Sequence, residues 1–162
     1  MMFDQLESAN IGSLQLYLRP LVCFLISIIA LKSNHIDFII TGFVVMLIGS
    51  SLFSSGLIQV NMNVIFYFSL IIVATGTYAI RALYFSIMQE GKIPLIYTGT
   101  AVGIISVIGY TPDIFATPAF GYLLDRYPGI YGHQLVFFIL AMFSVLGLMS
   151  SIMFKRLKNS II

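Results

Sequence analysis

Five long apolar runs, each separated from the next by a short polar stretch, dominate this sequence. A transmembrane helix needs about 20 mostly apolar residues, because each residue adds about 1.5 Å to a crossing of about 30 Å. Every run meets that length, and the period-2 alternation typical of barrel strands is absent. The sequence therefore predicts an all-α, polytopic transmembrane bundle of five helices, at residues 11–31, 38–58, 64–88, 95–124 and 134–154.

The composition indicates that the bilayer is the solvent of this chain. Hydrophobic residues make up 59% of it and charged residues 9%, whereas soluble domains carry about 25% charge. A soluble fold would have too few polar residues to cover its surface. We expect a tail at residues 1–10, a membrane domain at 11–154 and a basic tail at 155–162.

The short loops carry their positive charge unevenly. With five alternating spans, one side of the membrane receives Lys32, Lys92, Lys155, Arg156 and Lys158, and the other side receives only Arg126. Lys and Arg in short loops favour the cytosolic side. The pattern predicts a multi-pass protein with its C-terminus in the cytosol and its N-terminus outside.

Small residues and prolines predict how the helices pack and bend. Small side chains let helices approach closely in lipid, and they recur at Gly42, Gly49 and Gly56, at Gly99 and Gly103, and at Ser144, Gly147 and Ser151. Pro112 and Pro118 each remove a backbone donor within one span. We expect that span to be bent or locally broken between them.

Three ionisable residues, Arg19, Arg81 and Asp113, lie within the predicted spans. An Arg or Asp at mid-helix costs roughly 2.5–3.5 kcal/mol on insertion scales. All three are therefore expected to face protein or a watery cavity and not lipid.

Polar neighbours follow these charges at helical spacing. They are Tyr78 and Tyr84 around Arg81, Ser106, Tyr110 and Thr117 around Asp113, and Gln15 beside Arg19. Three helices that each present one polar stripe are typical of an aqueous pathway or an internal binding site. One alternative is a structural bridge from Asp113 to Arg19 or Arg81. Another is that the arginines snorkel towards the headgroups.

The sequence lacks the motifs of several enzyme classes. The sequence has no phosphate-binding G-x-x-x-x-G-K, no G-x-S-x-G or H-E-x-x-H motif and no paired carboxylates. We therefore expect no enzyme, no catalytic residue, no metal, no cofactor and no nucleic-acid partner. His35 and His133 look too isolated for ligation or catalysis, and Glu90 with Lys92 reads as a solvated turn.

Four segments resemble the C-terminal half of major facilitator superfamily permeases, particularly bacterial sugar-phosphate and nitrate-type organic-anion carriers. They are "YLRP", "RALYF", "GKIPLIYTGTAVGIISVIGYTPDIF" and "GYLLDRYPG". By this resemblance the five helices would be the eighth to the twelfth of twelve. The loop after the eighth helix usually carries a glycine-aspartate-arginine gating motif, whereas here "SIIALKSNH" keeps only Lys32.

The resemblance implies a secondary transporter of the bacterial inner membrane that moves a small anionic solute by alternating access. Arg81 would be the favoured anion contact and Arg19 the second, with Tyr78, Tyr84 and Tyr110 shaping the cavity. Asp113 would couple to protons or hold an arginine when substrate is absent. The chain would then be a C-terminal portion, from a truncated gene, a split gene or a misplaced start, whose partner is the missing N-terminal half. The alternative is a small membrane subunit or assembly partner without transport activity.

Overall fold

The protein is an all-α membrane helix bundle, seen here in a computed structural model that describes residues 5–30, 34–56 and 63–161. Within these residues, four helices are long and apolar enough to cross a membrane, and α1 adds the shorter apolar stretch Leu16–Ala30. Some of the predicted features lie outside the described residues. They are residues 1–4 of the tail, residues 31 and 57–58 of the spans, and Lys32.

The long helices begin or end away from the predicted limits. Polar residues extend the first and the last of them past the apolar runs, whereas the third ends before its predicted limit. Their bounds are α1 (Gln5–Ala30), α2 (His35–Ser54), α3 (Asn63–Leu83), α5 (Thr98–Arg126) and α6 (Ile130–Ile161). Residues 155–161, expected to form a basic tail, continue α6 as helix.

The third predicted span changes its helix type before it ends. After α3 the chain forms a 3-10 turn, η1 (Tyr84–Ser86), and the short α4 (Ile87–Glu90). The Ser86 hydroxyl donates to the carbonyl of Leu83, and such a local side-chain bond competes with the regular helical ladder. A second 3-10 turn, η2 (Leu95–Tyr97), follows Pro94 and leads into α5.

Positive-φ glycines lie beside two helix ends. Gly56, at φ +70°, follows the last residues of α2, and Gly129, at φ +93°, follows Pro128 in the turn between α5 and α6. A side chain at either position would clash in this left-handed conformation, which glycine adopts freely.

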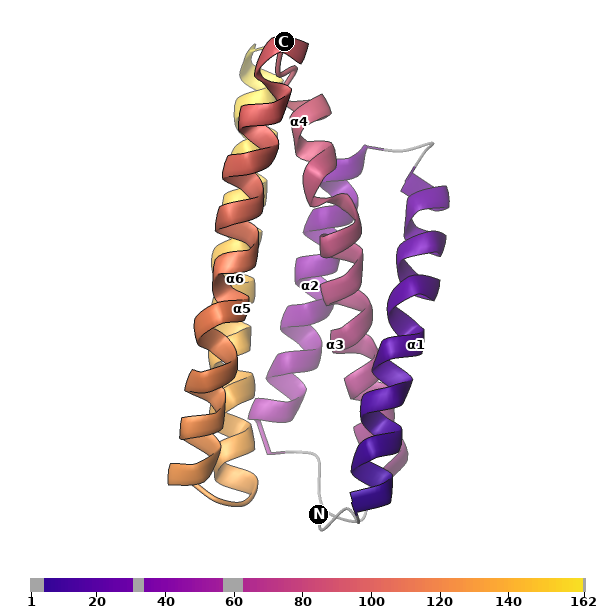
Figure 1. Ribbon diagram of the computed structural model, residues 1–162, viewed down its shortest axis with the longest axis vertical. Helices are drawn as coiled ribbons and strands as arrows, with labels where there is room; N and C mark the ends of the chain where they lie inside the picture. Colours follow the sequence, from indigo (N-terminus) through magenta and orange to yellow (C-terminus); the bar gives the residue numbers. More distant parts are fainter. Residues whose placement is uncertain (1–4, 31–33, 57–62, 162) are drawn as a thin grey trace.

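In space the helices follow the order α1, α3, α2, α6, α5, as Figure 1 shows. The α2 helix lies at the centre, packed against α3 on one side and α6 on the other. A methyl group at Gly42 would meet Ile80 and Gly76 of α3, and one at Gly49 would meet Val73. The predicted small-residue seam of α2 is confirmed at these two positions.

The remaining small residues divide between packed and open positions. Ser144 is fully buried, and a methyl group at Gly147 would collide with the Phe43 ring of α2, so the seam of α6 is confirmed there. The seam predicted at Gly99 and Gly103 is wrong within the described residues, because added methyl groups there would meet nothing within 4 Å.

The α5 helix lies at the outside of the bundle beside α6, and its described residues include no buried one. It runs unbroken through Pro112 and Pro118, so the predicted local break is absent. Proline is tolerated in membrane helices where local bonds compensate for the lost donor. Here the Thr111 hydroxyl donates to the carbonyl of Val107 beside Pro112.

Candidate functional site

An ion pair between Arg81 of α3 and Asp113 of α5 lies at the centre of the candidate site. The Arg81 Nη2 atom donates to both carboxylate oxygens of Asp113, at 2.7 Å to Oδ1 and 3.0 Å to Oδ2. Charge-assisted bonds of this kind are the strong class of hydrogen bond. Of the two bridges open to Asp113 from the sequence, the structure forms the one with Arg81.

Both partners remain accessible, with 40% of the Arg81 side chain and 51% of the Asp113 side chain exposed. Only one terminal nitrogen of Arg81 serves Asp113, whereas a guanidinium offers five N–H donors. The other terminal nitrogen and Nε therefore remain uncommitted to this carboxylate. An anion that reached the pair could bind Arg81 beside Asp113 or in place of it.

Tyr84 and Tyr110 extend the contact between the two helices by one turn. The ring of Tyr84 lies against α5 at Gly109, where an added methyl group would be 3.6 Å from its Cε2 atom. Tyr110 lies beside the Tyr84 hydroxyl. That hydroxyl is buried and makes no hydrogen bond of ordinary geometry within the described part of the chain.

The 3-10 turn sets this arrangement. Its first residue, Tyr84, directly follows Leu83, the last residue of α3, and lies three residues after Arg81. Its ring also packs at 4.0 Å, centroid to centroid, on that of Phe85. A 3-10 segment that interrupts a long helix often marks a hinge. The candidate site therefore lies where α3 gives way to η1.

The remaining predicted site residues are Arg19 and Tyr78. Arg19 of α1 is exposed and forms no ion pair with any described residue. The side chain of its neighbour Gln15 lies outside the described residues. Tyr78 is half-buried, and its carbonyl accepts a 3.8 Å bond from the Cys23 Sγ atom, which ties α1 to α3. The α1 stripe is thus not joined to the Arg81–Asp113 pair.

A second polar cluster, not predicted, joins three segments at the end of the bundle that carries the C-terminus. We call it the end cluster. Its members are His35 and Asp37 of α2, Glu90 of α4, and Lys155 and Lys158 of α6. Lys155 Nζ lies 2.5 Å from Asp37 Oδ1, and Lys158 Nζ bonds Glu90 Oε2. The backbone N–H of His35 donates to Glu90 Oε1 at 3.2 Å, and its Nδ1 atom lies 3.3 Å away.

The interpretation of Glu90 as part of a solvated turn is wrong. His35, which looked too isolated for ligation or catalysis, contacts this carboxylate. Only 12% of the Glu90 side chain is exposed. Its hydrogen bond to Lys158 lowers the pKa of the carboxyl below 4.5 against the opposing effect of burial, and His35 contributes in the same direction. The sequence could have indicated this cluster, because the predicted topology already places the loops that carry Asp37 and Glu90 on the same side of the membrane as Lys158.

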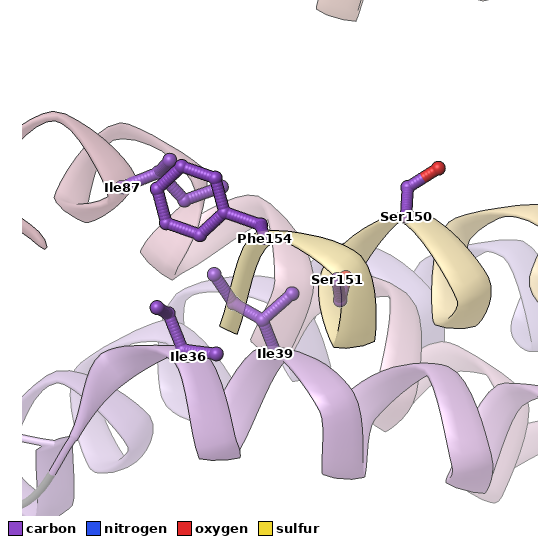
Figure 2. A pocket seen from close by; sticks show the side chains of 6 residues that line it. All are labelled: Ile36, Ile39, Ile87, Ser150, Ser151 and Phe154. Carbon is purple, nitrogen blue, oxygen red and sulfur yellow. The ribbon is translucent and has the colours of Figure 1, made fainter. Parts of the chain in front are cut away.

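An apolar pocket of about 230 Å³ adjoins the end cluster. Figure 2 shows its walls, which are Ile36 and Ile39 of α2, Ile87 of α4, and Ser150, Ser151 and Phe154 of α6. The Ser151 hydroxyl donates to the Gly147 carbonyl at 2.8 Å, so its polar atom is already engaged. The lining is otherwise dominated by aliphatic carbon and one aromatic ring.

Within the described part of the chain, no group of three or more His, Cys, Asp and Glu side chains is placed so that it could hold a metal ion. The end cluster supplies two carboxylates and one imidazole, but Lys155 and Lys158 occupy both carboxylates. Ammonium groups at those positions would repel a cation. Both polar clusters are therefore organised as pairs of opposite charge.

Two curated relatives resemble parts of this chain. It is 41% identical to "Inner membrane protein YihN" of Escherichia coli strain K12 over 76 residues, which are 47% of this chain and 18% of that protein. It is 40% identical to "Inner membrane protein YqcE" of the same organism over 57 residues, which are 35% of this chain and 13% of that protein. The matched regions thus span less than a fifth of either relative. No family model and no solved structure matches the chain.

Proposed function

We propose that this chain is the C-terminal portion of a secondary transporter of the major facilitator type, which moves a small anionic solute by alternating access. The observation that carries the proposal is the accessible Arg81–Asp113 ion pair between α3 and α5. Charges within membrane spans are costly and mark substrate or ion pathways. A pair that joins two helices and keeps half of each side chain exposed suits a pathway better than a buried bridge does.

The proposed role of Arg81 is to bind the anion. Without substrate, Asp113 neutralises the guanidinium and keeps both charges compatible with the membrane. An entering anion takes over the free N–H donors, and a proton on Asp113 releases the carboxylate from Arg81. Binding of the anion and of the proton would thus favour each other.

The aromatic residues shape the proposed cavity. Tyr84 and Tyr110 lie one turn from the ion pair, and the buried Tyr84 hydroxyl lacks an ordinary partner among the described residues. A substrate oxygen would satisfy that donor, which a buried polar group requires. Tyr78 on the same helix, and Arg19 as a second anion contact, are proposed to line the path further away.

The relatives support a bacterial inner membrane as the location, because the printed names of YihN and YqcE both place them there. The unequal loop charges support a cytosolic C-terminus. A complete path is proposed to need the further helices of a first half, since the matched regions are a small part of each relative.

Electrical recording on proteoliposomes tests the proposal. The protein is expressed from its natural locus together with the neighbouring reading frames, so that a first half encoded there is purified with it. The proteoliposomes are then exposed to pulses of sugar phosphates, carboxylates, sulfonates and nitrate across a range of pH. We expect at least one anion to evoke a current that Arg81→Gln abolishes. We expect Asp113→Asn to remove the pH dependence of that current.

The matched control is Arg126→Gln, at an exposed arginine at the far end of α5. This variant should keep the full current. Silence toward every anion, or an unchanged response in Arg81→Gln, would contradict the transporter proposal.

The second candidate is a membrane subunit without transport activity, and the absence of buried residues among those described in α5 favours it. An apolar helix with one bare side is suited to pair with another membrane segment. Such a subunit would give no anion current in the same recordings. It would form crosslinks from α5 to an unrelated membrane protein.

A further inference from the structure

The pocket at the C-terminal end of the bundle has the volume and the chemistry of a lipid site. A water molecule occupies about 30 Å³ in the liquid, so about 230 Å³ leaves room for several methylene-sized groups. The walls come from α2, α4 and α6, and Phe154 and Ile87 line the pocket opposite Ile36 and Ile39 (Figure 2). Apolar cavities of this kind do not hold water well, and they accept a hydrocarbon chain.

Two lysines directly follow residues at or beside the pocket. Lys92 follows Gly91, where an added methyl group would lie 3.7 Å from the Phe154 ring, and Lys155 follows Phe154 directly. Lys92 is exposed, and 43% of the Lys155 side chain is exposed although it is paired with Asp37. An ammonium group offers three donors, and Asp37 accepts from Lys155 through a single carboxylate oxygen.

The two carboxylates of the end cluster do not balance the cations around it. Asp37 and Glu90 face Lys155 and Lys158, while Lys92 and Arg156 form no ion pair within the described ranges. Lys92 thus adds a positive charge beside the apolar pocket that no carboxylate in the described ranges offsets. An anionic phospholipid presents the complementary groups, an acyl chain and a phosphate.

We propose that this pocket binds an acyl chain of an anionic phospholipid whose phosphate is held by Lys92 and Lys155. The bilayer supplies the ligand directly, because the pocket lies on helices long and apolar enough to span it. A soluble anion would gain nothing from the apolar walls, and a zwitterionic lipid would gain little from the surplus charge. The site is separate from the Arg81–Asp113 pair and does not depend on the proposed transport function.

Fluorescence quenching tests the site in the full chain, which contains no tryptophan. Phe154→Trp then places a single reporter in the pocket wall. In phosphatidylcholine vesicles, dibrominated phosphatidylglycerol should bind next to the reporter about fivefold more strongly than dibrominated phosphatidylcholine. Lys92→Asn should bring this ratio close to one, because it removes the cation that holds the phosphate. Asparagine is chosen because it tolerates the φ of +50° at that position.

Two controls match this design. Phe143→Trp places the reporter on the same helix at a side chain that is 54% exposed, where both lipids should quench equally. Arg126→Gln removes a cation at the far end of α5 and should leave the preference at position 154 intact. Equal quenching by both lipids at position 154 would overturn the proposal. So would quenching by neither lipid, which would mean that protein, such as a second copy, fills the pocket.

A second measurement avoids any change to the pocket wall. The delipidated natural chain is titrated with phosphatidylglycerol or phosphatidylcholine and examined by native mass spectrometry. We expect retention of one phosphatidylglycerol, and its loss in Lys92→Asn combined with Lys155→Gln. Equal retention of both lipids by the natural chain would contradict the proposed site.

Discussion

Single residues decide whether charge can exist within these membrane spans. Arg81 and Asp113 each carry an insertion cost of roughly 2.5–3.5 kcal/mol on their own. Their short contacts of 2.7 and 3.0 Å let each charge compensate the other once the helices have met. The stability of the contact between α3 and α5 should therefore depend on both residues together.

A double-mutant cycle measures this dependence. We expect Arg81→Gln and Asp113→Asn each to destabilise the protein, and the double variant to lose less than the sum of the two. The coupling should be about 0.6–1.7 kcal/mol, the range found for polar contacts between membrane helices. Unfolding in mixed micelles of increasing SDS content provides the free energies. Strictly additive losses would show that the pair does not form.

The pKa of Glu90 makes the end cluster sensitive to acid. The folded-state pKa lies below 4.5, chiefly because of the Lys158 hydrogen bond. A carboxyl whose pKa is lowered on folding stabilises the protein above its unfolded value and loses that contribution as the pH falls through the folded value. The natural chain should thus lose thermal stability below about pH 4.5.

The Glu90→Gln variant should be less stable than the natural chain at neutral pH by roughly 1.5–3 kcal/mol, as for a hydrogen bond to a charged group. Its melting temperature should also fall less between neutral pH and pH 4 when followed by circular dichroism. Asp125→Asn, at an exposed carboxyl beyond this cluster, serves as the control with the natural pH profile. Parallel profiles for Glu90→Gln and the natural chain would contradict the assigned pairing.

Among the elements, α2 and α3 pack closely, whereas α5 has the loosest attachment. A methyl group at Gly76 of α3 would stand 2.8 Å from the Gly42 carbonyl oxygen and 3.0 Å from the Met46 nitrogen. Both neighbours are backbone atoms, so they cannot rotate away. A methyl group added at Gly103 of α5 would have nothing within 4 Å.

Gly76→Ala and Gly103→Ala test this contrast as a matched pair of helix-interior changes. Alanine favours a helix by about 1 kcal/mol over glycine. Gly103→Ala should therefore leave the free energy of unfolding unchanged or slightly raised. Gly76→Ala should lower it by about 1–3 kcal/mol, the usual cost of overpacking. Equal effects of the two changes in SDS titration would show that α2 and α3 do not pack as described.

The sequence was sufficient to predict that the chain forms apolar helices, because hydropathy is a local property. The alternation of the spans also predicted that Asp37, Glu90 and Lys158 lie at the same end of the bundle. The sequence also predicted the seam at Gly42 and Gly49, since spacing along one helix defines a face. The empty position at Gly103 was not predictable in this way. The same spacing occurs whether or not a second helix covers that face.

The pairing of Asp113 shows a second limit of sequence reasoning. Helical spacing placed Arg19, Arg81 and Asp113 on polar stripes of three helices, but it left two arginines as partners for one carboxylate. The choice follows from tertiary packing, in which α3 lies between α1 and α2 and its end contacts α5. The 3-10 turn at Tyr84 was missed because it depends on the local bond from Ser86 to Leu83.

The whole molecule is a row of helices with the candidate site towards one of its outer members. The order α1, α3, α2, α6, α5 leaves α5 attached through α6 and through the contacts of Arg81 and Tyr84. In the proposed transporter, the side of α5 that carries Asp113 faces water within the complete protein, and its other side faces lipid. This difference in environment is the central claim.

Cysteine labelling measures that difference directly. The native Cys23 is first replaced by serine, and single cysteines are placed at Tyr110 and Phe115, whose side chains have nearly equal exposed fractions of 52% and 51%. The two positions lie on different sides of α5. In intact membranes, a charged, water-soluble thiol reagent should label Tyr110→Cys rapidly and leave Phe115→Cys unmodified. Protection of both cysteines, or faster labelling at position 115, would contradict an aqueous site around Arg81 and Asp113.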